Sequence, residues 1–339
     1  MSYCSIHTFE ISRKLGDNEY WQFRNYFYEA KLKIINRKTY LNVISYANEG
    51  VRIRLINNDN QKYLFIVINL QEVIDNGNLV DIIHPADLET AFDLLEEKLK
   101  RIIGPGFKFS YYKLSRLDFC TNINVGEKEQ VQEYLRIFNF KIGDRKGYKI
   151  EGRNSKRKDT LRGFCGTNIS NDTQIAIYDK EEQLIYIGKD EHAKNARGII
   201  RFEYRLISSK AVDEHISGCD SIREKVMYCV CNSAEIMLAA LQQYELQGTY
   251  IKLKAARRRI DSSDIRDRHK IRAKELLKLI SKKHSMKLGK KALMETDPRI
   301  KSEAYNKVTD YLRMLDINPI TLGSKSIYKE LPALYSLLK

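Results

Sequence analysis

The sequence predicts an α+β fold, with an antiparallel sheet, flanking helices, two related halves and a basic helical C-terminal region. Segments that alternate apolar and polar residues recur through the first 210 positions, and apolar residues at helical spacing stand between them. After about position 211, helical patterns replace the alternation. We therefore expect an α+β domain over residues 1–210, with halves of about 1–104 and 105–210, and a helical region over 211–339.

The first half contains alternating segments followed by a helix. Residues 31–47, 51–56 and 63–70 alternate, and the polar run 57–60 between the last two predicts a hairpin turn. Leucine and phenylalanine at helical spacing predict a helix over 85–103.

The second half repeats this order of strand, helix and strands. Alternation predicts strands over 107–125, 161–167, 173–179 and 198–207, a helical pattern covers 127–138, and a polar, basic stretch covers 143–162. The repetition suggests that the two halves share one architecture.

The C-terminal region reads as four helices and is strongly basic. The expected helices cover 222–246, 263–283 with Ser262 or Ser263 as cap, 300–315 and 326–338. Between positions 251 and 291 there are 16 Lys or Arg residues against four Asp or Glu. A solvated helix surface and a phosphate-binding surface both fit this composition.

The charge of the whole chain favours a polyanionic partner. With 59 basic and 44 acidic residues, the net charge is +15, which suits DNA, RNA or an anionic membrane. Nucleic acid leads because we find no lipidation signal or amphipathic anchor, and no apolar run long enough to span a membrane. The six cysteines include no C-x-x-C pair, so we expect a reducing, cytoplasmic setting and no membrane association.

Three of the expected strands each carry polar residues on one face. If the strands lie in one antiparallel sheet, a single face gathers carboxylates, an amide, a phenol and cations. These residues are Asp118 and Asn122 from the first strand, Tyr178 and Lys180 from the second, and Arg201, Glu203 and Arg205 from the third.

Chemistry on a phosphodiester uses these residue types. Asp118, Glu203 and the amide oxygen of Asn122 are hard ligands suited to Mg²⁺ or Mn²⁺. Tyr178 could attack phosphorus if a metal or Lys180 favours its phenolate. An alternative is that the two carboxylates face water or pair with neighbouring arginines. The six histidines form no His-x-His pair, and no phosphate-binding G-x-x-x-x-G-K-[ST] loop is present.

Three motifs, in this order, resemble the rolling-circle replication initiators of small plasmids and the gene II replication protein of filamentous phages. They are Leu-Ser-Arg-Leu-Asp ending at Asp118, Ile-Tyr-Asp-Lys ending at Lys180, and Ile-Arg-Phe-Glu-Tyr-Arg ending at Arg205. Related motifs occur in relaxases of conjugative elements. The resemblance covers roughly residues 110–210, and the basic helical tail agrees with the phage-type layout.

The resemblance implies a metal-dependent, site-specific DNA nicking-closing enzyme. Tyr178 would be its nucleophile, Lys180 a supporting group, and Asp118 and Glu203 its metal ligands; Asn122 stands where many members have a second acid. The expected partners are origin DNA, a host helicase and polymerase, and a second copy of the chain is left open. The arginines expected on DNA phosphates are Arg116, Arg201, Arg205, Arg257, Arg258 and Arg259.

Two further functions stay open from the sequence. A relaxase of a mobile element would use the same chemistry, and a DNA-binding regulator would bind without cutting. Tyr186 and Tyr204 are the alternative nucleophiles.

Overall fold

The computed structural model describes most of the chain. The described residues are 4–27, 31–35, 38–43, 46–58, 61–75, 79–142, 164–168, 172–216, 218–244, 247–297 and 302–338. The whole of the basic stretch expected over 143–162 lies outside them, and so do residues 161–163 of the strand expected over 161–167.

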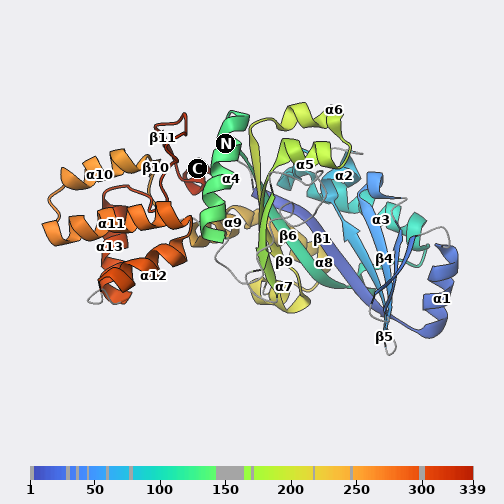
Figure 1. The fold of residues 1–339 in the computed structure, drawn as a ribbon. Helices are drawn as coiled ribbons and strands as arrows, with labels where there is room; N and C mark the ends of the chain where they lie inside the picture. The colour runs from blue at the N-terminus through green and yellow to red at the C-terminus, as the bar shows by residue number, and fades with distance from the viewer. Residues whose placement is uncertain are drawn as a thin grey trace.

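One nine-stranded sheet, antiparallel throughout, forms the centre of the molecule, in the order β2-β3-β4-β5-β1-β6-β9-β8-β7 (Figure 1). This confirms the expected antiparallel sheet. The strands are β1 Cys4–Leu15, β2 Lys31–Ile35, β3 Lys38–Val43, β4 Val51–Asn58, β5 Gln61–Ile68, β6 Lys113–Asn124, β7 Phe164–Asn168, β8 Thr173–Asp179 and β9 Ile199–Leu206.

The strand order repeats one topology on each side of the central pair β1 and β6. In the first half, the chain leaves β1 through α1 (Asp17–Tyr26) and returns through four strands until β5 lies beside β1. In the second, it leaves β6 through α4 (Lys128–Ile142) and returns until β9 lies beside β6. The expected two halves are therefore visible in the connectivity. The central strand β1 was not predicted from the sequence.

Helices cover the apolar face of the sheet. The ring of Phe92 from α3 (Leu88–Ile103) stacks on that of Phe9 in β1, with centroids 6.1 Å apart. Helix α4 packs on β7, β8 and β9. Three further helices pack on β1, β6 or β9, namely α7 Ser209–His215, α8 Ile222–Cys231 and α9 Ser233–Tyr244. Burial of these apolar faces is the main stabilising contribution to the fold.

A second cluster of helices lies beyond α4, at the opposite end of the molecule from α1 (Figure 1). It consists of α10 Leu253–Asp261, α11 Asp267–Lys283, α12 Met286–Thr296 and α13 Ser302–Met314. Gly289 lets α12 approach α11 closely, because a Cβ there would lie 2.5 Å from a side-chain carbon of Ile280. The helices after position 211 thus divide between the sheet and this cluster.

Five expected elements differ from the structure. The stretch expected as one strand over 31–47 forms the antiparallel pair β2 and β3. The strand expected over 107–125 begins at Lys113, after a 3₁₀ turn at Phe109–Tyr111. The helix expected over 222–246 is broken at Asn232, whose side-chain amide donates to the Tyr228 carbonyl at 2.8 Å. Helix α11 begins at Asp267, because Ser263 bonds back to the Ile260 carbonyl and closes α10 instead. Residues 326–338 contain the short strand β11 Glu330–Leu331 and a 3₁₀ turn, and Pro332 between them lacks the N–H that a helix needs. Among the described residues, no helix has the length and apolar character to cross a membrane.

Candidate active site

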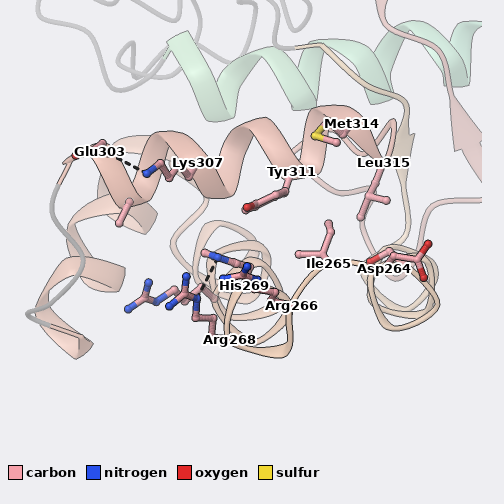
Figure 2. A pocket seen from close by; sticks show the side chains of 13 residues that line it. Asp264, Ile265, Arg266, Arg268, His269, Glu303, Lys307, Tyr311, Met314 and Leu315 are labelled. Atoms are coloured by element: carbon pink, nitrogen blue, oxygen red, sulfur yellow. Dashed lines mark hydrogen bonds and ion pairs between the residues drawn. The ribbon is translucent and has the colours of Figure 1, made fainter.

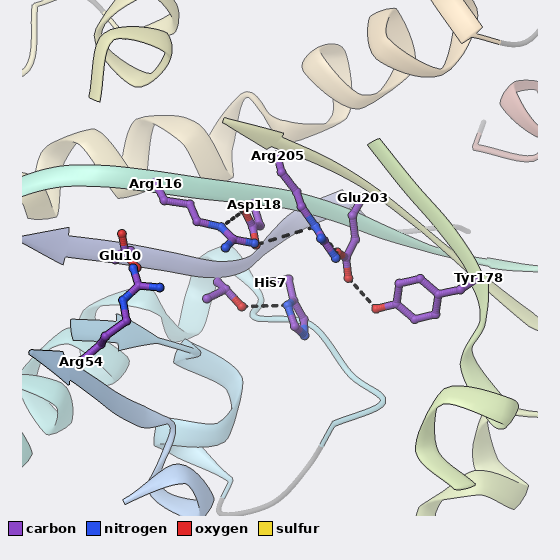
Figure 3. A network of polar contacts seen from close by, with 9 residues as sticks. His7, Glu10, Arg54, Arg116, Asp118, Tyr178, Glu203 and Arg205 are labelled. Atoms are coloured by element: carbon purple, nitrogen blue, oxygen red, sulfur yellow. Dashed lines mark hydrogen bonds and ion pairs between the residues drawn. The ribbon is translucent and has the colours of Figure 1, made fainter. Parts of the chain in front are cut away.

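The register of β6, β9 and β8 assembles the polar face that the alternation predicts. Asp118 pairs with Arg205, Asn122 with Arg201, and Tyr178 with Arg201 on its other side. Residues directly opposite in an antiparallel sheet project to the same face. Tyr178 therefore shares a face with both acidic residues, as Figure 3 shows.

Glu203 lies at the centre of this face and is almost completely buried. The hydroxyl of Tyr178 donates to its Oε1 at 2.5 Å, and Arg205 donates to its Oε2 through Nε at 2.8 Å (Figure 3). Burial alone would raise the pKa of Glu203, but Arg205 and then His7 hold it well below its ordinary value. Glu203 is therefore a carboxylate with both oxygens occupied.

Asp118 forms a second carboxylate–guanidinium pair in the same network. Arg116 donates to its two oxygens at 2.8 and 2.7 Å, and Arg205 Nε lies 4.0 Å from its Oδ2. Burial raises the pKa of Asp118 even though Arg116 opposes that shift. The alternative of carboxylates paired with neighbouring arginines is thus what the structure shows for both acids.

Tyr178 is held as a protonated phenol. Its side chain is only 5% exposed, and burial followed by the charge of Glu203 raises its pKa well above its ordinary value. Strand β8 ends one residue later, because Asp179 accepts a hydrogen bond from the Glu182 N–H and caps α5 (Lys180–Tyr186). The strand therefore stops at Asp179, and Lys180 is the first residue of a helix.

Lys180 and Arg201 are two buried cations that pair with no carboxylate within 4 Å in the described part of the chain. Lys180 donates to Gln183 at 2.9 Å, and burial followed by the charge of Arg201 lowers its pKa well below the ordinary value. Arg201 donates to Asn122 at 2.8 Å and to the Val80 carbonyl at 2.5 Å, while its remaining terminal nitrogen has no partner. Cations held this way favour an anionic ligand.

His7 is a member of the site that the sequence analysis missed. It occupies an irregularity in the pairing of β1 with β6, between Ile6 and Thr8, and its Nδ1 lies 2.8 Å from the Thr8 hydroxyl. Burial and nearby cations lower its pKa to about 3, although Glu203 opposes the shift. Cys4 and Ile6 are two residues apart, and so are Phe9 and Ile11, which could have suggested a strand. The shift at His7 puts the two pairs out of phase, so the alternation is broken.

A small cavity opens beside these groups. Its volume is about 150 Å³, and His7, Lys180, Arg52 and Glu72 are among the residues that line it. Burial raises the pKa of Glu72, and Arg52 opposes that shift. The cavity joins polar side chains from both halves of the sheet.

The arrangement does not form a ready site for a divalent metal. Oxygen donors of the right chemistry are present, but each carboxylate is engaged by an arginine, and the Asn122 oxygen accepts from Arg201. No three His, Cys, Asp or Glu side chains are grouped as metal ligands within the described ranges. A cation at Asp118 and Glu203 would have to displace Arg116 and Arg205.

The three arginines expected on DNA phosphates near position 258 lie elsewhere, on α10. Arg258 is exposed. Arg259 donates to the Leu315 and Asp316 carbonyls at 3.3 and 3.0 Å and so joins α10 to the end of α13. These residues do not contribute to the polar face of the sheet.

Comparison with known proteins adds little beyond this geometry. No protein-family model matches the chain, and no curated protein sequence matches it. A solved structure described as the rolling circle replication initiator protein from Geobacillus stearothermophilus aligns with 71% of this chain and 85% of its own, at 12% identity and a TM-score of 0.36. A similarity of this size leaves the function to be argued from the residues themselves.

Proposed function

We propose that the chain is a replication initiator that nicks one strand of a double-stranded origin through Tyr178. Attack would leave a 5′-phosphotyrosine link and a free 3′-hydroxyl, from which a host polymerase extends while a host helicase unwinds the duplex. The observation that carries the proposal is the convergence of Tyr178, Glu203 and Arg205 on one face with two cations that lack carboxylate partners. These cations are Arg201 on the same face and Lys180 at the start of α5. The net charge of +15 supports a DNA partner.

The contacts suggest how the proton and the phosphate would be handled. Tyr178 Oη would bond to phosphorus, its proton would pass to Glu203 Oε1, and the 3′-oxygen would leave and be protonated. Arg201 and Lys180 would bind the phosphate oxygens. A phosphate that engages Arg205 would also free Glu203 and raise the pKa of that carboxylate, which makes it a better proton acceptor.

Attack also requires access to the Tyr178 hydroxyl, which the surrounding residues cover. The chain near Val80 and Ile83 is bonded to this face, since the Val80 carbonyl accepts from Asn122 and Arg201, and the Ile83 carbonyl accepts from Ser5. The described state is therefore closed around the nucleophile, and the reaction requires these contacts to loosen.

An oligonucleotide assay with Asp118→Ala and Glu203→Ala tests the proposal. Both variants should bind duplex DNA nearly as well as the wild type and should lose strand cleavage by at least about a hundredfold. Parallel arms with Mg²⁺, with Mn²⁺ and with a chelator decide whether cleavage uses the metal that the resemblance implies or proceeds without one. Equal loss of binding and cleavage in either variant would assign that carboxylate to folding instead.

A DNA-binding regulator that never cuts is the second candidate function. The buried phenol of Tyr178 and the arginine pairs on Asp118 and Glu203 favour it, because each is stable as it stands. This candidate predicts metal-independent binding and no covalent adduct with any oligonucleotide.

A further inference from the structure

The largest cavity we describe lies far from the sheet, in the C-terminal helical cluster. It is a cleft of about 890 Å³ between α13 on one side and the turn 262–266 with the first residues of α11 on the other (Figure 2). Its floor and walls carry Ile265, Tyr311, Met314 and Leu315. A cleft of this size accommodates a nucleotide or a short peptide segment.

Cations outnumber acids around this cleft. Arg272 is paired with Asp297 at 3.1 Å, and Lys307 with Glu303 at 2.9 Å. Arg266 and Arg268 also line the cleft, and neither has a carboxylate within 4 Å in the part of the chain that the structure describes. Two guanidinium groups are therefore free to bind an anion.

The middle of the cleft holds a histidine with an unused ring nitrogen. His269 Nε2 accepts from Arg268 Nε at 3.2 Å, so the proton of the neutral ring is assigned to Nδ1, which is buried without a partner. Burial and the charges of Arg268, Arg272, Arg266 and Lys307 lower the pKa of His269. An anion in the cleft would offset those four charges.

An aromatic ring stands beside these cations. Tyr311 packs against the His269 ring with centroids 4.8 Å apart, and Figure 2 shows Met314 further along the same helix. Tyr311 is half-buried and Met314 is exposed. Arginines next to a partly accessible aromatic ring and a methionine are typical of sites where an unpaired base stacks while its phosphate is bound. A paired base in a duplex cannot enter such a cleft without leaving its stack.

We propose that the cleft between α11 and α13 binds an unpaired nucleotide of single-stranded DNA. Arg266 and Arg268 take the phosphate, and Tyr311 with Met314 receives the base. Binding itself follows from the cleft alone, and its role rests on the proposed function, since a nicked and unwound origin supplies a single strand.

The test measures the fluorescence anisotropy of a labelled poly-deoxythymidine oligonucleotide, which contains no origin sequence, as the full-length chain is added. The buffer contains a chelator. The double variant Arg266→Glu and Arg268→Glu should weaken binding at least tenfold, and Tyr311→Ala about tenfold, while Tyr311→Phe should keep most of the affinity. Arg313→Gln is the matched control, because Arg313 lies on the same helix outside the cleft and pairs with Asp310. The His269 ring signals in NMR should shift when the oligonucleotide is added to the wild type.

Three results would overturn this assignment. Unchanged affinity in the double variant, or in Tyr311→Ala with an unchanged melting temperature, excludes nucleotide binding in the cleft. If the same variants lose affinity for a matched duplex by the same factor, the cleft has no preference for a single strand. If a polyglutamate peptide competes as well as the oligonucleotide does, the cleft is a general site for acidic chains. Because no nicking occurs in this assay, its failure is distinct from a failure of the proposed function.

Discussion

At the scale of single residues, the site is organised around Glu203. Tyr178 donates to one carboxylate oxygen and Arg205 to the other, so the protonation of this one group decides how the phenol and the guanidinium are held. His7, Arg201 and Lys180 surround the same carboxylate electrostatically. A change in charge at any of these residues should therefore shift the pKa values of the others.

His7 gives the stability of the protein a measurable pH dependence. Its pKa is about 3 in the folded protein and about 6.5 in the unfolded chain, so between these values only the unfolded state takes up the proton. Stability should therefore fall as the pH drops below about 6.5. Between pH 7 and 5, the wild type should lose about 1 kcal/mol more unfolding free energy than His7→Gln, because the variant has no titrating ring. The difference is modest because water still reaches the half-buried ring of His7. Urea unfolding at both pH values measures this; parallel losses in the two proteins would contradict the neutral buried ring.

Arg201 should make the protein respond to a simple oxyanion. Inorganic phosphate at ten times its dissociation constant should raise the unfolding free energy of the wild type by about 1.4 kcal/mol. The reference is the same protein in chloride at equal ionic strength. Arg201→Met should abolish this gain, because it removes a buried cation with an unpartnered nitrogen. Lys128→Met is the control, since Lys128 already pairs with Glu182 at 2.6 Å. Retention of the full gain in Arg201→Met, measured by thermal unfolding, would place the anion elsewhere.

At the scale of elements, the junction before β9 sets where the polar strand begins. Gly198 has φ +75°, and a Cβ there would lie 2.1 Å from the Gly126 carbonyl oxygen, just after β6. Its own carbonyl accepts from the Val125 N–H at 2.9 Å. This close contact helps to place Glu203 beside β6.

Two glycine substitutions separate strain from collision. Gly188 has nearly the same backbone conformation, with φ +74°, but nothing lies within 4 Å of an added Cβ. Gly188→Ala should cost about 1 kcal/mol of stability, and Gly198→Ala about 3 kcal/mol or more, because backbone must move. Denaturant unfolding of both variants measures the difference. Equal losses of unfolding free energy would mean that the backbone at the junction can move to make room for the added Cβ.

The strands with strict alternation could be predicted from the sequence, and so could the face they form. Thr173–Asp179 is observed with the expected bounds, and Tyr178, Glu203 and Asp118 lie on one face because a period of two fixes their direction. Strand β1 was missed because the register shift at His7 interrupts the alternation. Partners across the sheet were also beyond the sequence, which is why the arginine pairs of both acids could only be raised as an alternative.

At the scale of the whole molecule, positive charge is concentrated in the helices beyond α4, away from the polar face of the sheet (Figure 1). Duplex affinity should fall linearly with salt on logarithmic axes, and Arg258→Gln should reduce that slope by about one. Arg259→Gln is the contrasting variant, because Arg259 bonds backbone carbonyls and should mainly lower stability. An unchanged slope in Arg258→Gln would remove α10 from the DNA-binding surface.

The central claim is that Tyr178 becomes covalently joined to DNA. Two other tyrosines serve as comparisons, since Tyr186 is 64% exposed on α5, and Tyr204 pairs with Phe119 and Ile175 on the opposite face of the sheet. The decisive measurement is the 5′-adduct formed with a radiolabelled origin oligonucleotide by the wild type, Tyr178→Phe, Tyr186→Phe and Tyr204→Phe. We predict that Tyr178→Phe alone abolishes the adduct. An adduct that persists in Tyr178→Phe and disappears in Tyr186→Phe would contradict the claim and leave Tyr178 as a group that only positions Glu203.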